Sequence, residues 1–394
     1  MLLIRAGRTE AQVTARGMAR PAPRAPRAAG YTRRMAVPLK EQFFQRPFLE
    51  RLADAIREVH PAFPRARFLR LVFDARWPGL ELKDRMHQAA DALGRTLPGD
   101  YRAALRILLA VEGRFSGFDH MLFADFVERF GTGDPEASLA ALERFTRSSA
   151  EFAIRPFLEQ DPEATLARML AWSASPDENL RRLASEGCRP RLPWGRRLPA
   201  LQRDPAPILP ILERLLDDPS AYVRRSVANN LGDVAKDHLD LALDLAERWL
   251  AEAPARAPLL KHALRGPLKA GNRRAMALFG YGEQPRMEVL ALEVRPHEVP
   301  LGGRAELRLA LRSKGRRAQT VRLEYELSYA RPAGRTARKV FRIAESALAP
   351  GAEVELVRRL DFRDRATRKH HRGAHELTLC VNGARVRTVR FALT

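Results

Sequence analysis

The amino-acid sequence predicts a multidomain protein in which an all-α solenoid of HEAT-like helical repeats is followed by an all-β immunoglobulin-like sandwich. Between about residues 40 and 280, apolar residues recur at helical spacing, with Asp-Pro or Pro-rich interruptions every 35 to 45 residues or so, as in paired-helix repeats. After Gly280 the pattern changes to short alternating runs separated by Gly, Pro and Asn, which predicts strands and turns. A chain of 394 residues with 45% hydrophobic side chains can bury more than one core.

The first 34 residues differ from the rest of the chain. They hold eight arginines and one acid, Glu10, and include the segment PAPRAPRAAG, a composition that cannot bury a hydrophobic face. We therefore expect residues 1–34 to be a disordered extension. The sequence from Met35, MAVPLKEQFF, is typical of a natural start, so we interpret the preceding segment as an upstream extension or a misassigned start. A transit peptide is the less favoured alternative.

Residues 35–283 are expected to form the helical domain, and two of its helices have a recognisable start. Asp161-Pro162 and Asp218-Pro219 each place an N-cap residue before a proline at the first helical position. The Asp side chain can accept a backbone N–H that has no partner within the helix, and Pro needs no such partner. Helices are therefore predicted to begin at both dipeptides.

Three similar segments support the repeat interpretation. Arg182, Arg225 and Arg265 recur at separations of 43 and 40 residues, inside LRRLASEG, YVRRSVANNLGD and LKHALRGPLKAG. This spacing is expected for HEAT-like units stacked into a solenoid. Pro267 should kink or end the last such helix.

Residues 286–394 are expected to form the sandwich, with about seven strands. The Cys-Trp-Cys pattern of antibody domains is missing, and the segment holds 24 Lys and Arg against 12 Asp and Glu, a net charge of +12. The strand-like runs are AELRLALR, VRLEYELSY, KVFRIAE, VELVRRLDF, HELTLCVNG and VRTVRFALT.

The charge balance indicates a polyanionic partner. The net charge is +22 and the sequence pI is about 11.1, which favours nucleic acid or an acidic membrane surface. The 61 arginines against 8 lysines can also reflect a GC-rich genome. No apolar run approaches the roughly 18 to 20 residues that span a bilayer. Cys188 and Cys380 form no pair motif, so we expect neither a disulfide framework nor a zinc knuckle, and a cytoplasmic location.

Several enzyme classes lose support. The sequence contains no Walker loop, Gly-rich dinucleotide fingerprint, Gly-x-Ser-x-Gly elbow or His-Glu-x-x-His helix, so we expect no cofactor. His370, His371 and His375 cluster in RKHHRGAHE. Without a matching Cys or Asp set, a basic loop that contacts phosphate is favoured over a metal site.

The helix expected after Asp218 has one apolar and one polar side. Arg225, Asn229 and Asp233 follow one another at four-residue steps, so they share a face. An exposed face with a hydrogen bond between Arg225 and Asn229 is the alternative to a functional site. The opposite side carries Val223, Val227, Leu231 and Val234.

Glu186 stands near the end of the helix NLRRLASE, just before Gly187. An acid opposes the helix dipole there, which favours a functional role. The alternative is an ion pair with Arg182 or Arg189.

The loop after this helix, CRPRLPWGRR, places Trp194 among Arg189, Arg191, Arg196 and Arg197. An aromatic residue interleaved with arginines suits a nucleic-acid surface. Trp194 could equally be a core anchor between repeats.

Glu151 lies three residues after Ser148, so a capping box can explain it. A functional role is favoured because Glu151 and Glu186 precede similar Arg-Pro dipeptides, at residues 155–156 and 189–190, in consecutive repeats. Equivalent positions of a solenoid can share one concave surface.

In four segments the chain resembles the AlkC family of DNA alkylation repair glycosylases. These are SAEFAIRPFL, RRLASEGCRPRLPWGRRL, DDPSAYVRRSVANNLGDVAKDH and KHALRGPLKAG. The similarity runs from about Met35 to the C-terminus, because the final domain is similar to the immunoglobulin-like domain of many members. Leu239, where a Pro is usual, and Pro267 are minor departures from the family pattern.

The resemblance implies excision of N3-methyladenine and N3-methylcytosine from duplex DNA, without a metal or cofactor. Matching the motifs gives Glu151, Glu186 and Asp233 as the catalytic acids, with Trp194 as their aromatic neighbour. Carboxylates there could stabilise an oxocarbenium-like state and orient water. We expect a monomeric, monofunctional enzyme in the bacterial cytosol, associated with the nucleoid, that forms no Schiff base with the sugar.

Five further residues, and the sandwich as a clamp, are expected to hold the DNA backbone without reading its sequence. A non-catalytic DNA-binding module and a scaffold for acidic proteins remain the alternatives. The five residues are Arg182, Arg189, Arg191, Arg225 and Asn229.

Overall fold

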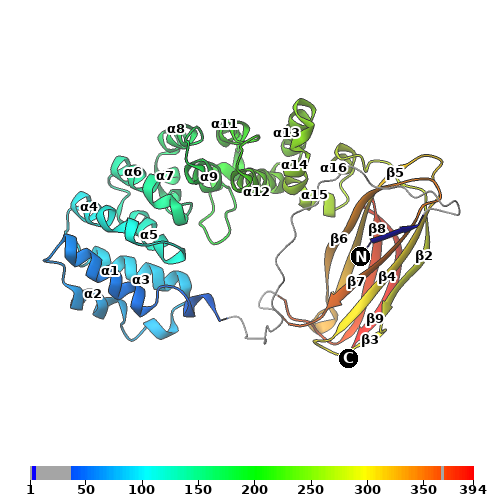
Figure 1. Ribbon diagram of the computed structural model, residues 1–394, viewed down its shortest axis with the longest axis horizontal. Coiled ribbons are helices and arrows are strands. Elements are labelled where there is room, and N and C mark those ends of the chain that lie inside the picture. The colour runs from blue at the N-terminus through cyan, green and yellow to red at the C-terminus, as the bar shows by residue number, and fades with distance from the viewer. Residues whose placement is uncertain (1, 6–36, 365–367) are drawn as a thin grey trace. The chain divides into compact units, whose positions relative to one another are not determined.

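The computed structural model describes residues 2–5, 37–364 and 368–394 (Figure 1). By packing, the described chain divides into two compact units. The helical unit comprises residues 37–242 and 258–263, and the second unit comprises the sandwich with the helical residues 243–257 and 264–278. Helices α15 (Arg265–Lys269) and α16 (Arg273–Leu278) and most of α13 (Leu239–Glu252) thus group with the sandwich, whereas the sequence suggested a boundary near residue 283.

The extension that we expected to be disordered lies mostly outside the described residues. Strand β1, Leu2–Arg5, is the described part of it. It pairs antiparallel with residues 353–356 of the sandwich, so disorder does not extend over these four residues.

The helices of the chain are mostly short and arranged in pairs. Their bounds are α1 Arg46–Val59, α2 Arg65–Val72, α3 Leu82–Gly94, α4 Tyr101–Val111, α5 Met121–Phe130, α6 Pro135–Phe145, α7 Arg155–Gln160, α8 Pro162–Trp172, α9 Glu178–Gly187, α10 Pro199–Arg203, α11 Leu209–Arg214, α12 Ala221–Asp237, α13 Leu239–Glu252, α14 Ala257–Ala263, α15 Arg265–Lys269 and α16 Arg273–Leu278. Short 3-10 helices lie at Leu39–Glu41, Trp77–Gly79, Glu112–Arg114, Phe118–His120, Thr146–Ser148, Ala206–Ile208, Pro254–Arg256 and Pro332–Gly334.

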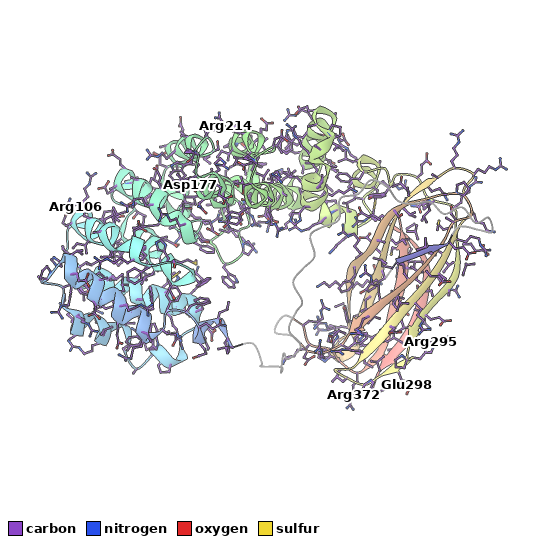
Figure 2. All side chains as sticks on the ribbon, in the orientation of Figure 1. Arg106, Asp177, Arg214, Arg295, Glu298 and Arg372 are labelled. Carbon is purple, nitrogen blue, oxygen red and sulfur yellow. The ribbon has the colours of Figure 1, made fainter. Side chains whose placement is uncertain are left out.

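In the helical unit the helices form two rows. Figure 1 shows α4, α6, α8 and α11 in an outer row and α3, α5, α7, α9 and α12 on the inside of the arc. Arg106 on α4 and Arg214 on α11 point away from the inner row (Figure 2). Buried apolar side chains of both rows form the core, among them Leu142 on α6, Leu212 on α11 and Phe123 on α5. The inner row therefore presents one continuous side on which residues of successive repeats can meet.

The two expected helix starts have different outcomes. Helix α8 begins at Pro162, and the Asp161 carboxylate accepts the N–H of Ala164, so this prediction is confirmed. Helix α12 begins at Ala221 instead of directly after Asp218, with Ser220 as its N-cap.

The Asp218 carboxylate is committed elsewhere, which explains the later start of α12. It accepts the backbone N–H of Ser220 and a bidentate pair of bonds from Arg181. The apolar side of α12 is buried as expected, through Val223, Val227, Leu231 and Val234. Near Pro267 the helical path breaks between α14, which ends at Ala263, and the five-residue α15, as its proline predicts.

The sandwich is immunoglobulin-like, as the strand pattern predicted. One sheet has the order β1-β7-β4-β2 and the other β3-β9-β8-β5-β6. Figure 2 labels Arg295, Glu298 and Arg372 at one end of it. The strands are β2 Met287–Arg295, β3 Glu298–Val299, β4 Arg304–Ser313, β5 Gln319–Ala330, β6 Thr336–Leu348, β7 Glu353–Asp361, β8 Gly373–Val381 and β9 Ala384–Leu393.

Two of the three histidines in RKHHRGAHE are buried, so they do not face a ligand from the surface, whereas Lys369 and Arg372 of the same segment are exposed. His370 and His375 are buried and pack against Tyr329 and Phe362. The His375 Nδ1 lies 3.0 Å from the Gly373 carbonyl oxygen. Desolvation lowers the pKa of both imidazoles.

Both cysteine thiols are free and buried. Burial raises the pKa of Cys188 to about 12 and that of Cys380 to about 11. Within the described part of the chain, no group of three His, Cys, Asp or Glu side chains has a metal-binding arrangement. None of the helices in these residues is long and apolar enough to cross a membrane.

Candidate active site

The three acids singled out in the sequence come from consecutive repeats of the inner row. Glu151 lies in the turn before α7, Glu186 in the last turn of α9 and Asp233 in α12. Their residues are 6%, 6% and 2% exposed. Buried carboxylates of this kind need specific partners, and each has them.

Glu151 is held by Arg182. Its two carboxylate oxygens accept bonds of 3.1 and 3.3 Å from the Arg182 guanidinium, which also lies 4.6 Å from the centre of the Tyr222 ring. A capping box does not explain Glu151, because the 3-10 turn ends at Ser148 and the next helix starts only at Arg155.

Glu186 is bound on both oxygens. Its Oε1 accepts a 2.6 Å bond from Arg189 Nη1, and its Oε2 accepts a 2.6 Å bond from the Ser226 hydroxyl of α12. Arg182 Nη2 lies 3.9 Å from the same Oε1. The ion pairs with Arg182 and Arg189 that the sequence allowed therefore both exist, within a larger network.

Asp233 is also bound on both oxygens. Arg189 Nε donates to its Oδ2 at 2.9 Å, and Lys236 Nζ donates to its Oδ1 at 2.8 Å. Although burial acts to lower the pKa of Arg189, Glu186 and Asp233 raise it overall. Arg189 therefore stays a cation between two buried anions.

Together these side chains form a run of alternating charge that we call the acid–base ladder. It contains three carboxylates and three cations, so its formal charges cancel. The three cations differ in exposure, since the side chains of Arg182, Arg189 and Lys236 are 14%, 8% and 57% exposed. The ladder runs Glu151, Arg182, Glu186, Arg189, Asp233, Lys236.

A second set of buried polar groups supports the ladder. The Ser185 hydroxyl donates to that of Ser226 at 2.6 Å, and Asn230 Nδ2 donates to the Ser185 carbonyl at 2.8 Å. Arg155 Nη1 donates to the Gly187 carbonyl at 2.9 Å, and desolvation lowers its pKa to about 10.

Sequence reasoning missed Ser226 and Lys236 as members of the site. Spacing gives a signal for both. Lys236 lies three residues after Asp233 in the motif GDVAKDH, and Ser226 lies one turn before Asn230 on the buried side of the same helix.

Trp194 differs from the acids in being exposed. The residue lies in the loop after α9, is 61% exposed and has a backbone φ of +66°. Its carbonyl accepts a 3.0 Å bond from Lys83, and it lines a small apolar hollow with Phe152 and Phe44. The core-anchor alternative is therefore wrong. Within the described residues, no hydrogen bond or ring contact joins its indole to the three acids.

The expected DNA contacts also separate into two groups. Arg182 and Arg189 are tied to the acids, and Arg189 is only 6% exposed, so their burial does not fit the expectation that they contact phosphate. Arg225 is exposed on α12, and Arg191 pairs with Asp237.

Asn229 does not bond to Arg225, the pairing that was the alternative to a functional face. Its Oδ1 lies 3.0 Å from His262 Nε2. Arg191, Arg225 and Asn229 are thus exposed or half-buried, and Arg191 and Asn229 already have polar partners on the protein.

Comparison with known proteins relates the whole arrangement to a family. Residues 288–394 match the family model of the C-terminal Ig-like domain of the uncharacterised protein YhaZ, and residues 208–238 match the HEAT repeat. The chain is 41% identical over 344 residues to uncharacterized protein YhaZ of Bacillus subtilis (strain 168), covering 87% of this chain and 96% of that protein.

A solved structure gives a closely related architecture. Pseudomonas fluorescens alkylpurine DNA glycosylase AlkC, bound to DNA containing an abasic site analog, matches with a TM-score of 0.87 and 40% identity, over 91% of this chain and all of that one. This chain belongs to the AlkC family. The AlkC family assignment covers both the repeat region and the immunoglobulin-like domain, so the ladder and the sandwich belong to one architecture.

Proposed function

We propose that this protein is a DNA glycosylase that removes alkylated bases from duplex DNA. The observation that carries the proposal is the acid–base ladder, in which three consecutive repeats bring Glu151, Glu186 and Asp233 into one network. The similarity to AlkC, whose name and bound DNA are those of an alkylpurine glycosylase, supports it. Clustered buried carboxylates are costly for a protein that only binds DNA, because both DNA and carboxylates are anionic.

The proposed substrates are bases that alkylation has made cationic, N3-methyladenine and N3-methylcytosine. Such a base leaves as a neutral molecule, so its departure needs little help from an acid. As the C1′–N bond breaks, its electron pair goes to the base and positive charge moves to the sugar. The enzyme's task is to stabilise that cation, and carboxylates do this electrostatically.

Glu186 and Asp233 are proposed as the principal catalytic residues, with Glu151 in support. Because Arg189 holds one oxygen of each carboxylate, their positions are fixed before the substrate arrives, which is the condition for electrostatic catalysis. A water molecule adds its oxygen to C1′ and gives a proton to a carboxylate. The products are the free base and an abasic sugar.

Trp194 is proposed to contact the cationic base or the sugar from the surface side. Its exposure suits a group whose ring meets a ligand, and a cation over an indole is attracted by the ring's quadrupole. Arg191, Arg225 and Asn229, together with the basic sandwich, are proposed to hold the backbone phosphates. Arg182 and Arg189 take the different role of positioning the acids.

The enzyme is proposed to be monofunctional, that is, to form no Schiff base with the sugar, although the amine of Lys236 lies at the site. Its ammonium is paired with Asp233, and a protonated amine is not a nucleophile. Borohydride should therefore trap no covalent complex with abasic DNA. A trapped adduct that disappears in Lys236→Met would overturn this point.

The decisive experiment is base release from methylated duplex DNA. Wild-type protein should liberate N3-methyladenine and N3-methylcytosine, and Glu186→Gln and Asp233→Asn should each lower the single-turnover rate at least tenfold. Asp134→Asn is the matched control, because Asp134 pairs with Arg102 on an outer-row helix. Unchanged release in the Glu186 and Asp233 variants would indicate a non-catalytic DNA-binding protein.

A further inference from the structure

The acid–base ladder has no net formal charge, although its proposed role is to stabilise a cation on the sugar. Three carboxylates are balanced by three cations, so the free protein offers a developing sugar cation little net attraction. Opposite charges a few ångströms apart largely cancel at the distance of a third charge. One of the cations would have to move before the acids are in excess.

Two of the three cations cannot move easily. Arg182 and Arg189 have side chains 14% and 8% exposed, and Arg189 bonds to two carboxylates at once. Withdrawing either one would leave buried carboxylates without a counter-charge, which is strongly unfavourable.

Lys236 is different in each respect. Its side chain is 57% exposed, it makes one bond, to Asp233 Oδ1, and it stands in the last turn of α12 at the solvent edge. Asp233 is buried, but the Lys236 ammonium reaches it from the solvent side, so the ammonium can move without leaving a buried site, and a lysine stem is long and flexible. If the Lys236 ammonium moved away, Asp233 Oδ1 would lose its donor, but Oδ2 of the same carboxylate would keep its bond from Arg189.

We propose that Lys236 is a mobile positioning residue whose ammonium neutralises Asp233 in the free protein and moves to a DNA backbone phosphate in the complex. This inference rests on the proposed function. DNA binding then leaves the ladder with one more anion than cations, next to the cationic lesion. The acids would acquire their net charge only when a phosphate is present.

The neighbourhood of Lys236 suits a phosphate. Arg191 lies beside it, paired with Asp237, the residue that follows Lys236. Arg191 donates through Nε and Nη2 to Asp237, so its guanidinium lies at the same end of α12 as Lys236. Two cations at the rim, in front of buried anions, form a phosphate contact that faces the catalytic acids.

The salt dependence of DNA binding tests the proposal. The probe is a duplex with an uncleavable abasic-site analogue, and the measured quantity is the slope of log K against log salt concentration. Each neutralised phosphate contributes about 0.9 to that slope. Lys236→Ala should reduce the slope by about 0.9 and weaken binding roughly fivefold at about 0.15 M salt. Lys236→Arg should restore most of the slope.

Asp233→Asn separates the proposal from a purely structural ion pair. If Lys236 already binds phosphate in the complex, removing its partner leaves the slope unchanged. If Lys236 stays on Asp233, the substitution frees it and the slope rises by about 0.9, while Lys236→Ala changes nothing. That second pair of results would overturn the proposal.

Arg102→Ala and Asp134→Asn are the matched controls, because they remove the two halves of another exposed pair on the outer row. Neither should alter the slope. Base release by the wild-type protein is measured in parallel. If the wild-type protein releases the base normally and Lys236→Ala leaves the salt slope unaltered, only the role proposed for Lys236 is refuted, and the glycosylase assignment stands. No release, with the expected slopes, refutes only the glycosylase assignment.

Discussion

Arg189→Met offers the sharpest test of how the site is held together. Methionine keeps much of the apolar stem but removes the guanidinium that bonds to Glu186 at 2.6 Å and to Asp233 at 2.9 Å. Both carboxylates are buried, so water cannot replace the lost cation without disturbing the packing. We expect a large loss of stability together with a loss of base release.

The magnitude follows from the burial. Removing one partner of a buried ion pair costs about 3–5 kcal/mol, because a buried charge is left uncompensated. For a unit of this size, 1 kcal/mol shifts the melting temperature by roughly 2–4 °C, so the helical unit should melt roughly 6–20 °C lower.

Thermal unfolding followed by circular dichroism at 222 nm measures this effect, since that signal comes mainly from the helices. Arg191→Met is the control, because the Arg191–Asp237 pair is more exposed and can be replaced by water. It should lower the melting temperature much less. Equal losses of melting temperature for the two variants would refute the reasoning.

Three other outcomes are expected. Ser226→Ala leaves Glu186 Oε2 without its hydroxyl donor, so unfolding should cost about 1–3 kcal/mol less and base release should slow; equal stability in a denaturant titration would contradict this. Trp194→Ala should weaken lesion binding by about 1–3 kcal/mol with the melting temperature unchanged, because the residue is exposed; a lower melting temperature would indicate a core role. Burial lowers the pKa of His370 and His375 below 6.5, so the stability that their neutral forms provide is present above pH 6.5 and is lost as the pH falls through the lowered values. The stability of the sandwich, measured by unfolding followed by β-sheet circular dichroism at pH 8 and at pH 5, should therefore be lower at pH 5. Equal stability at both pH values would count against the burial argument.

The fold class was predictable because both periodicities are carried by the chain itself. Helical spacing before Gly280 and strand alternation after it do not depend on tertiary context. Competition between residues for the same side chain was harder to predict. The start expected at Asp218 moved to Ser220 because Arg181, which is distant in sequence, takes the Asp218 carboxylate. The grouping of residues 264–278 with the sandwich is likewise a matter of packing, which composition does not reveal.

For the candidate site, sequence could bring the acids to one surface but could not assign their partners. The same arginine can serve a phosphate or a carboxylate, and only its burial decides between them. That is why Arg189 was expected on DNA but lies between two acids. For Trp194 the sequence left a core role and a ligand-facing role equally open, and its exposure removes the core role.

The two buried thiols have a consequence if the protein acts on alkylated DNA, as proposed. Reagents that methylate bases also attack sulfur, and the thiolate is the form that reacts. Burial raises the pKa of Cys188 to about 12 and that of Cys380 to about 11, so almost no thiolate exists at neutral pH, and packing shields the sulfur atoms. The folded protein should therefore resist, at its cysteines, the same chemical exposure that creates its proposed substrates.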